Sequence, residues 1–183
     1  MEKDIVRRKA RQILTSLSIE RINENSLIVS KNIISLIEDI QKSITSRTLI
    51  IGAYCPLQQE VLWFRSFKEN EFSYCVPHVI DVNRMEFYKI PFKKIVQGSL
   101  GLVLDKEDRG ELAVPDVLIV PGLAFSTSKN RLGRGRGFYD RYLSQFKGIK
   151  IGVCFSEQVF ESIPTDEFDQ NMNYLVTEKK IYK

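Results

Sequence analysis

The sequence predicts an α/β fold, namely a single-domain, three-layer sandwich around a mainly parallel sheet spanning residues 1–183. Three observations support this fold class. Short apolar runs rich in β-branched residues recur along the chain, amphipathic segments with helical spacing separate them, and no Pro/Gly/Ser-rich linker divides the sequence. Strands that alternate with helices are typical of layered folds with parallel sheets. A length of 183 residues with 43% hydrophobic residues suffices for one sizeable core.

The expected helices are amphipathic and begin at the N-terminus. Residues 2–17 form the first, and Ser18 is placed to cap a second helix that runs to about residue 42. Further helices are expected at 60–69 and 137–146. Trp63 and His78 are both assigned structural roles, Trp63 as a core residue and His78 at a strand end.

The expected strands are short apolar runs, several of which are bounded by proline. They lie at residues 48–54, 72–76, 85–90, 117–120, 150–155 and 174–177. In open α/β sheets, ligands bind beyond the carboxyl ends of the strands. The loops that follow Tyr54 and Val120 are therefore the expected location of a binding site.

Bulk composition limits the classes of function. The net charge of +4 suits an anionic ligand such as a nucleotide, but it is too small to indicate nucleic acid without a clustered patch. Cys55, Cys75 and Cys154 are widely spaced and form no CxxC pair, so we expect buried, inert thiols rather than disulfides or a metal site. The sequence shows no targeting segment and no apolar run long enough for a membrane span, which predicts a cytoplasmic protein.

The most informative segment is NRLGRGRGFYD, residues 130–140. Its three glycines alternate with arginines, directly after a strand and loop and directly before a helix. Glycines allow backbone N–H groups to converge, and a helix N-terminus adds unpaired N–H groups. The three arginines of the segment can add charge-assisted hydrogen bonds to phosphoryl oxygens. Asp140, one turn into the helix, suits magnesium, or else it only complements the helix dipole.

Other interpretations of this segment remain open at this point. It is neither a Walker loop nor the GxGxxG dinucleotide fingerprint, because its glycines are spaced GxGxG. A surface loop, or an arginine-glycine segment that binds RNA, would also fit the composition. The aromatic residues that continue into a packed helix favour phosphate binding over both.

The longer stretches PGLAF and NRLGRGRGFYDRYL resemble the signature of the 5-formyltetrahydrofolate cyclo-ligases, also called 5,10-methenyltetrahydrofolate synthetases. Weaker similarity extends over nearly the whole chain. The resemblance implies a Rossmann-like sheet and an ATP- and Mg²⁺-dependent ligase of one-carbon metabolism. Its reaction converts 5-formyltetrahydrofolate and ATP to 5,10-methenyltetrahydrofolate, ADP and phosphate, through phosphorylation of the formyl oxygen.

The resemblance also implies roles for individual residues. Arg134 and Arg136 would be catalytic, Glu60 and Tyr139 would bind folate, and Asp140 and Asp169 would bind magnesium. The ATP-binding set would be Lys3, Arg7, Asn130, Arg131, Leu132, Gly133, Arg134, Gly135, Arg136, Gly137 and Phe138. The expected partners are ATP and 5-formyltetrahydrofolate, with or without a polyglutamate tail, and neither nucleic acid nor a membrane; the expected state is a monomer.

The sequence departs from the family pattern at four positions: Leu62, Ser126, Lys129 and Asn173. Aspartate is common at position 126, glycine at 129 and aspartate at 173, whereas an acidic residue and threonine commonly follow Glu60. These departures leave a diverged relative that binds nucleotide or folate without turnover as the first alternative. An RNA-binding module is the second.

Overall fold

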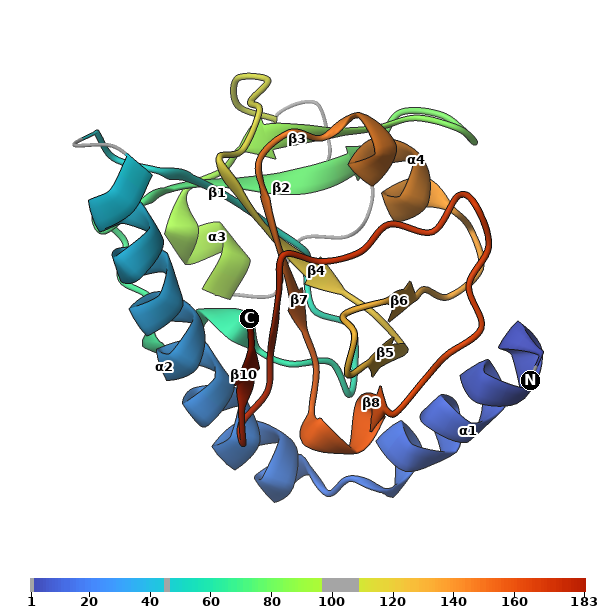
Figure 1. Cartoon of the computed structure of the whole chain (residues 1–183). Helices are drawn as coiled ribbons and strands as arrows, with labels where there is room; N and C mark the ends of the chain where they lie inside the picture. The colour runs from blue at the N-terminus through green and yellow to red at the C-terminus, as the bar shows by residue number, and fades with distance from the viewer. Residues whose placement is uncertain (1, 45–46, 97–108) are drawn as a thin grey trace.

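The computed structural model describes residues 2–44, 47–96 and 109–183 (Figure 1). Its centre is a seven-stranded sheet in the order β10-β9-β7-β4-β1-β2-β3. The strands are β1 (Ile50–Ala53), β2 (Ser73–Val79), β3 (Met85–Lys89), β4 (Val117–Pro121), β7 (Ile149–Val153), β9 (Tyr174–Val176) and β10 (Ile181–Tyr182). The pairs among β2, β1, β4, β7 and β9 are parallel, and only β3 and β10 at the two edges are antiparallel. The predicted α/β class with a mainly parallel sheet is therefore confirmed.

Four α-helices occur among the described residues. They are α1 (Lys3–Ser16), α2 (Ile19–Ile44), α3 (Phe92–Val96) and α4 (Phe138–Gln145). Figure 1 shows α2 on the left of the central strands and α4 at the upper right. The expected cap is present, because Ser18 Oγ accepts a hydrogen bond from Arg21 N at 3.2 Å. No helix among the described residues is both long enough and apolar enough to cross a membrane.

The core consists of two hydrophobic clusters, and the central strands contribute to both. In β4, Val117 and Ile119 pack in the cluster that holds the apolar face of α2. Leu118 and Val120 pack in the other cluster, with Leu143 of α4. This division follows from the alternation of side chains along a strand. It explains why β4 is apolar throughout, since a central parallel strand is covered on both faces.

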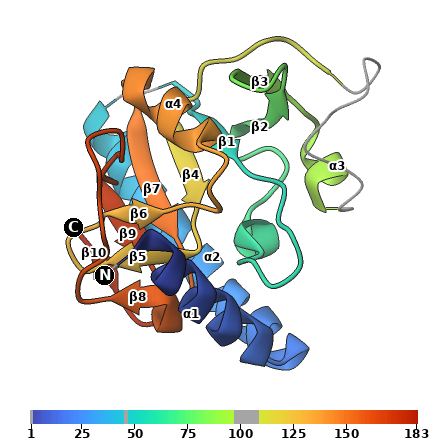
Figure 2. The same ribbon diagram turned by 90° about the vertical axis from the view of Figure 1, so that its right-hand side faces the viewer.

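A second, three-stranded sheet was not predicted from the sequence. It consists of β5 (Ala124–Ser126), β6 (Arg131–Leu132) and β8 (Val159–Phe160), in the order β6-β5-β8. Figure 2 shows this sheet behind α1, close to the N-terminus. Its strands are only two or three residues long, too short for a recognisable alternating pattern. It matters because β5 and β6 carry the chain into the glycine-rich loop.

The helix predicted at 60–69 is wrong. Only Trp63–Ser66 is helical, as the short 3₁₀ turn η1. Trp63 is fully buried, and its indole Nε1 donates to Tyr54 O at 2.8 Å while its own carbonyl accepts from Ser30 Oγ. These tertiary hydrogen bonds replace the i to i−4 bonds of a regular helix. The expected core role of Trp63 is confirmed.

The prediction that Pro77 closes a strand is also wrong, because β2 continues to Val79. Pro77 lies opposite Phe87 of β3, but Phe87 O accepts its hydrogen bond from Ala113 on the far side. The nitrogen of Pro77 therefore points away from β3, toward the side where pairing with β1 has ended at Cys75. No ladder hydrogen bond is lost there, which makes proline tolerable. The neighbouring His78 is buried, with its ring edge-on to Tyr88.

Candidate active site

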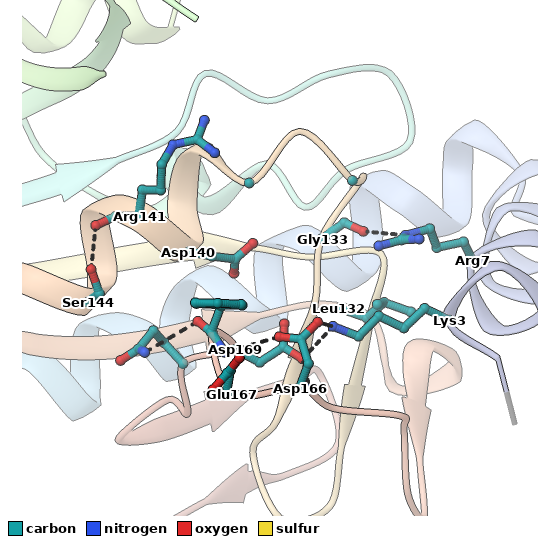
Figure 3. Close-up of a pocket in the computed structure, with 14 residues that line it drawn as sticks. Lys3, Arg7, Leu132, Gly133, Asp140, Arg141, Ser144, Asp166, Glu167 and Asp169 are labelled. Carbon is teal, nitrogen blue, oxygen red and sulfur yellow. Dashed lines mark hydrogen bonds and ion pairs between the residues drawn. The ribbon is translucent and has the colours of Figure 1, made fainter. Parts of the chain in front are cut away.

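A pocket of about 520 Å³ lies among α1, the glycine-rich loop, the start of α4 and the segment 166–170 (Figure 3). Its lining combines basic side chains, glycine backbone and carboxylates. The lining residues are Lys3, Arg7, Leu132, Gly133, Gly135, Gly137, Asp140, Arg141, Ser144, Asp166, Glu167, Phe168, Asp169 and Gln170. Segments from both ends of the sequence therefore meet at one cavity.

The glycine-rich loop leaves the small sheet at Leu132 and enters α4 at Phe138. Two of its residues have positive φ angles, +102° at Gly135 and +68° at Gly137. Residues other than glycine rarely adopt such φ angles, so the glycines at these positions meet a requirement of the backbone. Gly137 is the N-cap of α4, and the loop therefore delivers the unpaired N–H groups of a helix N-terminus to the pocket.

Helix α1 brings two cations to the pocket. Its buried face consists of Val6, Ala10 and Leu14, and Lys3 and Arg7 are four residues apart and both line the cavity. Arg7 Nε donates to Gly133 O at 3.2 Å, which joins α1 directly to the glycine loop.

Lys3 also forms ion pairs with two carboxylates at the pocket. Its Nζ lies 2.6 Å from Asp166 Oδ2 and 2.6 Å from Asp169 Oδ2. Although burial acts to lower the pKa of Lys3, the hydrogen bonds that Lys3 donates to the two carboxylates raise it overall. The same hydrogen bond from Lys3 lowers the pKa of Asp166. Lys3 and Asp166 are therefore both charged near neutral pH.

Arg131 takes a different place from the one expected. Its side chain is only 4% exposed and does not line the pocket. Nη1 donates to Pro121 O at 3.0 Å, and Nη2 donates to Asp140 Oδ1 at 2.7 Å. The guanidinium also lies over the ring of Tyr139, 5.4 Å from its centroid. Arg131 thus fixes the direction of Asp140 instead of reaching toward a phosphate.

Arg134 and Glu60 form a contact at the edge of the loop. Arg134 Nη2 donates to Glu60 Oε1 at 2.8 Å, and Nε donates to the same oxygen at 3.3 Å. The other carboxylate oxygen of Glu60 accepts from Leu57 N. The loop that follows β1 is therefore connected to the glycine loop through one ion pair.

Tyr139 lies beneath these groups with its hydroxyl buried. That hydroxyl has no hydrogen-bond partner within the described part of the chain, and burial raises the pKa of Tyr139. A buried phenol without a partner is costly in the empty protein. It is a candidate donor for a substrate group that reaches this depth.

The carboxylates can be compared with the needs of a magnesium ion. No cluster of three or more His, Cys, Asp or Glu side chains that could hold a metal occurs among the described residues. Asp140 and Asp169 nevertheless line the same pocket, with exposed fractions of 25% and 12%. Magnesium characteristically binds one or two carboxylates together with substrate phosphates and water. These two side chains fit that pattern and not that of a preformed metal cage.

The predicted site residues divide into two sets. The pocket brings together Lys3, Arg7, Leu132, Gly133, Gly135, Gly137, Asp140 and Asp169. It is not lined by Glu60, Asn130, Arg131, Arg134, Arg136, Phe138 or Tyr139. Lining residues that sequence reasoning did not assign are Arg141, Ser144, Asp166, Glu167, Phe168 and Gln170. Among these, Arg141 directly follows the motif, and Asp166 and Glu167 are acidic neighbours of Asp169 that the sequence could not separate from it.

Two of the four departures have a structural counterpart. Lys129 has a φ of +66°, a conformation that explains why glycine is common at this position. Ser126 Oγ accepts hydrogen bonds from Asn130 N at 3.1 Å and Nδ2 at 3.2 Å. A serine oxygen therefore closes the turn that precedes the glycine loop.

Comparisons with known proteins all point to one family. The model of the 5-formyltetrahydrofolate cyclo-ligase family matches residues 2–178. A probable 5-formyltetrahydrofolate cyclo-ligase of Schizosaccharomyces pombe is 31% identical over 64% of this chain and 67% of its own. The 5-formyltetrahydrofolate cyclo-ligase of Mus musculus is 24% identical over 94% and 92%.

Solved structures agree with the sequence comparisons. The 5,10-methenyltetrahydrofolate synthetase of Aquifex aeolicus has a TM-score of 0.76 and 31% identity, and the match covers all of this chain and 93% of that one. A 5,10-methenyltetrahydrofolate synthetase from Mycoplasma pneumoniae, at 22% identity, has a TM-score of 0.73 over 97% of this chain and 99% of its own, and it supports the fold alone.

Proposed function

The chain belongs to the 5-formyltetrahydrofolate cyclo-ligase family, and we propose that the pocket beside α1 binds the ATP used in its reaction. The reaction is the ATP-dependent cyclisation of 5-formyltetrahydrofolate to 5,10-methenyltetrahydrofolate. The single observation that supports the location best is the meeting of Lys3, Arg7 and the glycine loop at one cavity. Two cations and a helix N-terminus are what an ATP polyphosphate requires.

The phosphates would lie along the glycine loop. Backbone N–H groups at the N-terminus of α4 would bind phosphoryl oxygens, and Lys3 and Arg7 would neutralise their charge from the opposite wall. Arg134 and Arg136 lie on the exposed outer part of the loop. We assign them to the transferring phosphoryl group, which they would reach when both substrates are bound. Asn130, Arg131, Leu132 and Phe138 would support the loop from behind.

Magnesium would be held by Asp140 and Asp169. When bound, it neutralises the charge that develops on the β- and γ-phosphates during transfer. The Arg131 guanidinium would orient Asp140 for this role, because it binds one carboxylate oxygen and leaves the other for a metal. In this structure Lys3 also donates to one oxygen of Asp169. This proposal requires Lys3 to move from the carboxylates toward a phosphate when the nucleotide and metal bind.

Folate would bind on the other side of the loop, near Glu60 and Tyr139. Glu60 and the loop after β1 lie at the carboxyl ends of the parallel strands, where ligands of such sheets bind. The buried hydroxyl of Tyr139 would gain a partner on binding. Polyglutamylated folates are included in this proposal, as are a monomeric state and a single functional unit over residues 1–183.

The chemistry follows from the substrate. The N5-formyl group is an amide, so its oxygen leaves poorly. The formyl oxygen attacks the γ-phosphorus and ADP departs. N10 then attacks the activated carbon and loses its proton to solvent, and phosphate leaves as the methenyl bridge forms. Phosphoryl transfer depends mainly on positioning and charge neutralisation. No general base is needed for the first step, in agreement with a site that contains no histidine within the described lining.

The cellular setting is proposed to be the cytoplasm. All three cysteines are free thiols, which suits a reducing compartment. Burial raises the pKa of Cys55 to about 11 and that of Cys75 to about 12, so these thiols are protonated near neutral pH. We propose neither a catalytic role nor a disulfide for these cysteines.

The reaction can be measured directly. Purified protein is mixed with 5-formyltetrahydrofolate, ATP and magnesium, and the near-ultraviolet absorbance of the methenyl product is followed. We expect a rise that requires all three components. No rise in protein that still binds ATP would contradict the proposal and favour a diverged nucleotide- or folate-binding relative. Loss of ATP binding as well would favour the RNA-binding alternative.

A further inference from the structure

Arg141 makes an unusual set of contacts for a side chain on an exposed helix face. Its Nε donates to Asn83 O at 2.9 Å, and its Nη2 donates to Val82 O at 3.2 Å and to Arg136 O at 3.2 Å. The first two carbonyls belong to the turn between β2 and β3, and the third belongs to the glycine loop. One guanidinium therefore holds two distant segments, and its ring contact with Phe138, 5.3 Å from the centroid, fixes it further.

The turn that supplies two of these carbonyls is itself well fixed. Asp81 Oδ1 accepts from Asn83 N at 2.8 Å and from Arg84 N at 2.9 Å, and Ile80 N donates to Arg84 O at 2.9 Å. An aspartate that bonds the backbone two and three residues later stabilises a turn. The turn is thus a rigid support against which Arg141 can hold the loop.

The contact with Arg136 O determines the direction of a backbone N–H. The carbonyl of Arg136 and the N–H of Gly137 belong to one trans peptide unit and point in opposite directions. When the guanidinium holds this carbonyl, the N–H of Gly137 is turned away from Arg141. In Figure 3, the Arg141 side chain extends upward from α4, whereas Lys3 and Asp169 lie lower in the view, and all three line the pocket. The N–H of Gly137, a residue that itself lines the pocket, therefore lies on the side away from Arg141.

Arg7 performs the same task at the other end of the loop. By holding Gly133 O it fixes the peptide unit that contains the N–H of Arg134. Between these two anchors, Gly135 and Arg136 are exposed. The orientation of the loop therefore depends on one arginine at each end.

We propose that Arg141 is a positioning residue that fixes the glycine loop to the turn between β2 and β3 and thereby orients the Gly137 N–H toward the nucleotide phosphates. This inference rests on the proposed location of the ATP site. It makes the turn at residues 80–84, which does not line the pocket, a part of the nucleotide-binding apparatus. The recognised chemistry is that of a phosphate oxygen accepting from a preoriented backbone amide.

The test is a double-mutant cycle between Arg141 and the turn. Binding of ADP in excess magnesium is measured by calorimetry for the wild type, Arg141→Ala, Asp81→Ala and the combined variant. We expect the dissociation constant to rise about tenfold in Arg141→Ala, the scale of one charge-assisted hydrogen bond. Asp81→Ala should raise it about threefold, and the combined variant should resemble Arg141→Ala alone. In turnover, KM for ATP should rise while KM for the folate stays unchanged.

Two further variants serve as controls. Arg141→Lys keeps the charge but cannot bridge three carbonyls, so its dissociation constant should remain raised. Lys147→Ala removes one exposed positive charge just after α4 and should bind ADP like the wild type.

Several outcomes would overturn the inference. Unchanged ADP affinity in folded Arg141→Ala would do so. A wild-type ADP dissociation constant in Arg141→Lys would instead indicate that Arg141 binds phosphate directly. An unchanged ADP dissociation constant in Asp81→Ala would indicate the same. Additive effects would mean that the two residues act separately. A wild-type protein that forms no methenyl product would contradict the proposed function itself. The ADP-binding measurements do not depend on turnover, so they distinguish that failure from a failure of the Arg141 inference.

Discussion

Replacing Arg134 with alanine tests whether the glycine loop takes part in phosphoryl transfer. The side chain is 45% exposed, and its ion pair with Glu60 has an Nη2 to Oε1 distance of 2.8 Å. Solvent screens a pair of this kind, so its contribution to the free energy of unfolding is about 0.2–1 kcal/mol. For a chain of this size, that corresponds to a decrease of at most roughly 4 °C in Tm.

The expected effect on turnover is much larger. If the Arg134 guanidinium stabilises charge on the transferring phosphoryl group, its removal should lower kcat about 10²–10³-fold, the range for one preorganised donor. That corresponds to roughly 3–4 kcal/mol of transition-state stabilisation. A change in stability of at most about 1 kcal/mol cannot produce such a loss in a protein that remains folded.

The two quantities are measured on the same preparation. Formation of the methenyl product is followed by absorbance with saturating ATP, and Tm is followed by circular dichroism. Arg65→Ala is the matched control, because Arg65 is an exposed arginine that donates to Asn23 on the surface. A folded Arg134→Ala protein with the kcat of the wild type would refute the assignment, and an equal loss in Arg65→Ala would show an effect of net charge.

Two more predictions concern carboxylates. Asp140→Asn should raise the magnesium concentration for half-maximal rate about tenfold, because one anionic ligand is lost; a titration curve equal to that of the wild type would contradict the metal role. Asp116→Asn should lower Tm at pH 7 by about 2–6 °C. Although burial opposes the shift, hydrogen bonds from Arg47 and Ile50 N lower the pKa of Asp116 in the folded protein. This stabilisation is present above the unfolded pKa of about 3.9 and is lost as pH falls through the lower folded value. The Tm difference should therefore shrink below about pH 4, and a constant difference across pH would contradict it.

Much of the fold could be predicted from the sequence because its signals are local. The strand β4 reads as a continuous apolar run, since both of its faces are covered, and the helical spacing of α1 and α2 is regular. The helix expected at 60–69 failed because Trp63 makes tertiary hydrogen bonds that no local pattern encodes. Pro77 was interpreted as a strand end because the absence of a strand partner on one side cannot be seen in the sequence.

The candidate site was predictable in its centre and less so at its edges. The alternating glycines of residues 133–137 signal positive φ angles, which the structure shows at Gly135 and Gly137. The direction of Arg131 could not be foreseen, because an arginine beside a glycine loop can face either the pocket or Asp140. Asp166 could not be distinguished from Asp169 in the sequence, because both approach the pocket through contacts with Lys3 of the distant N-terminal helix.

The ion pair between Lys3 and Asp169 joins residues separated by 166 positions. During synthesis the chain emerges from its N-terminus, so Lys3 is exposed long before Asp169 leaves the ribosome. The two walls of the pocket can therefore meet only after Asp169 has left the ribosome. Until then, the nascent chain carries Lys3, Arg7 and the glycine-rich loop without Asp169, so one wall of the pocket is missing.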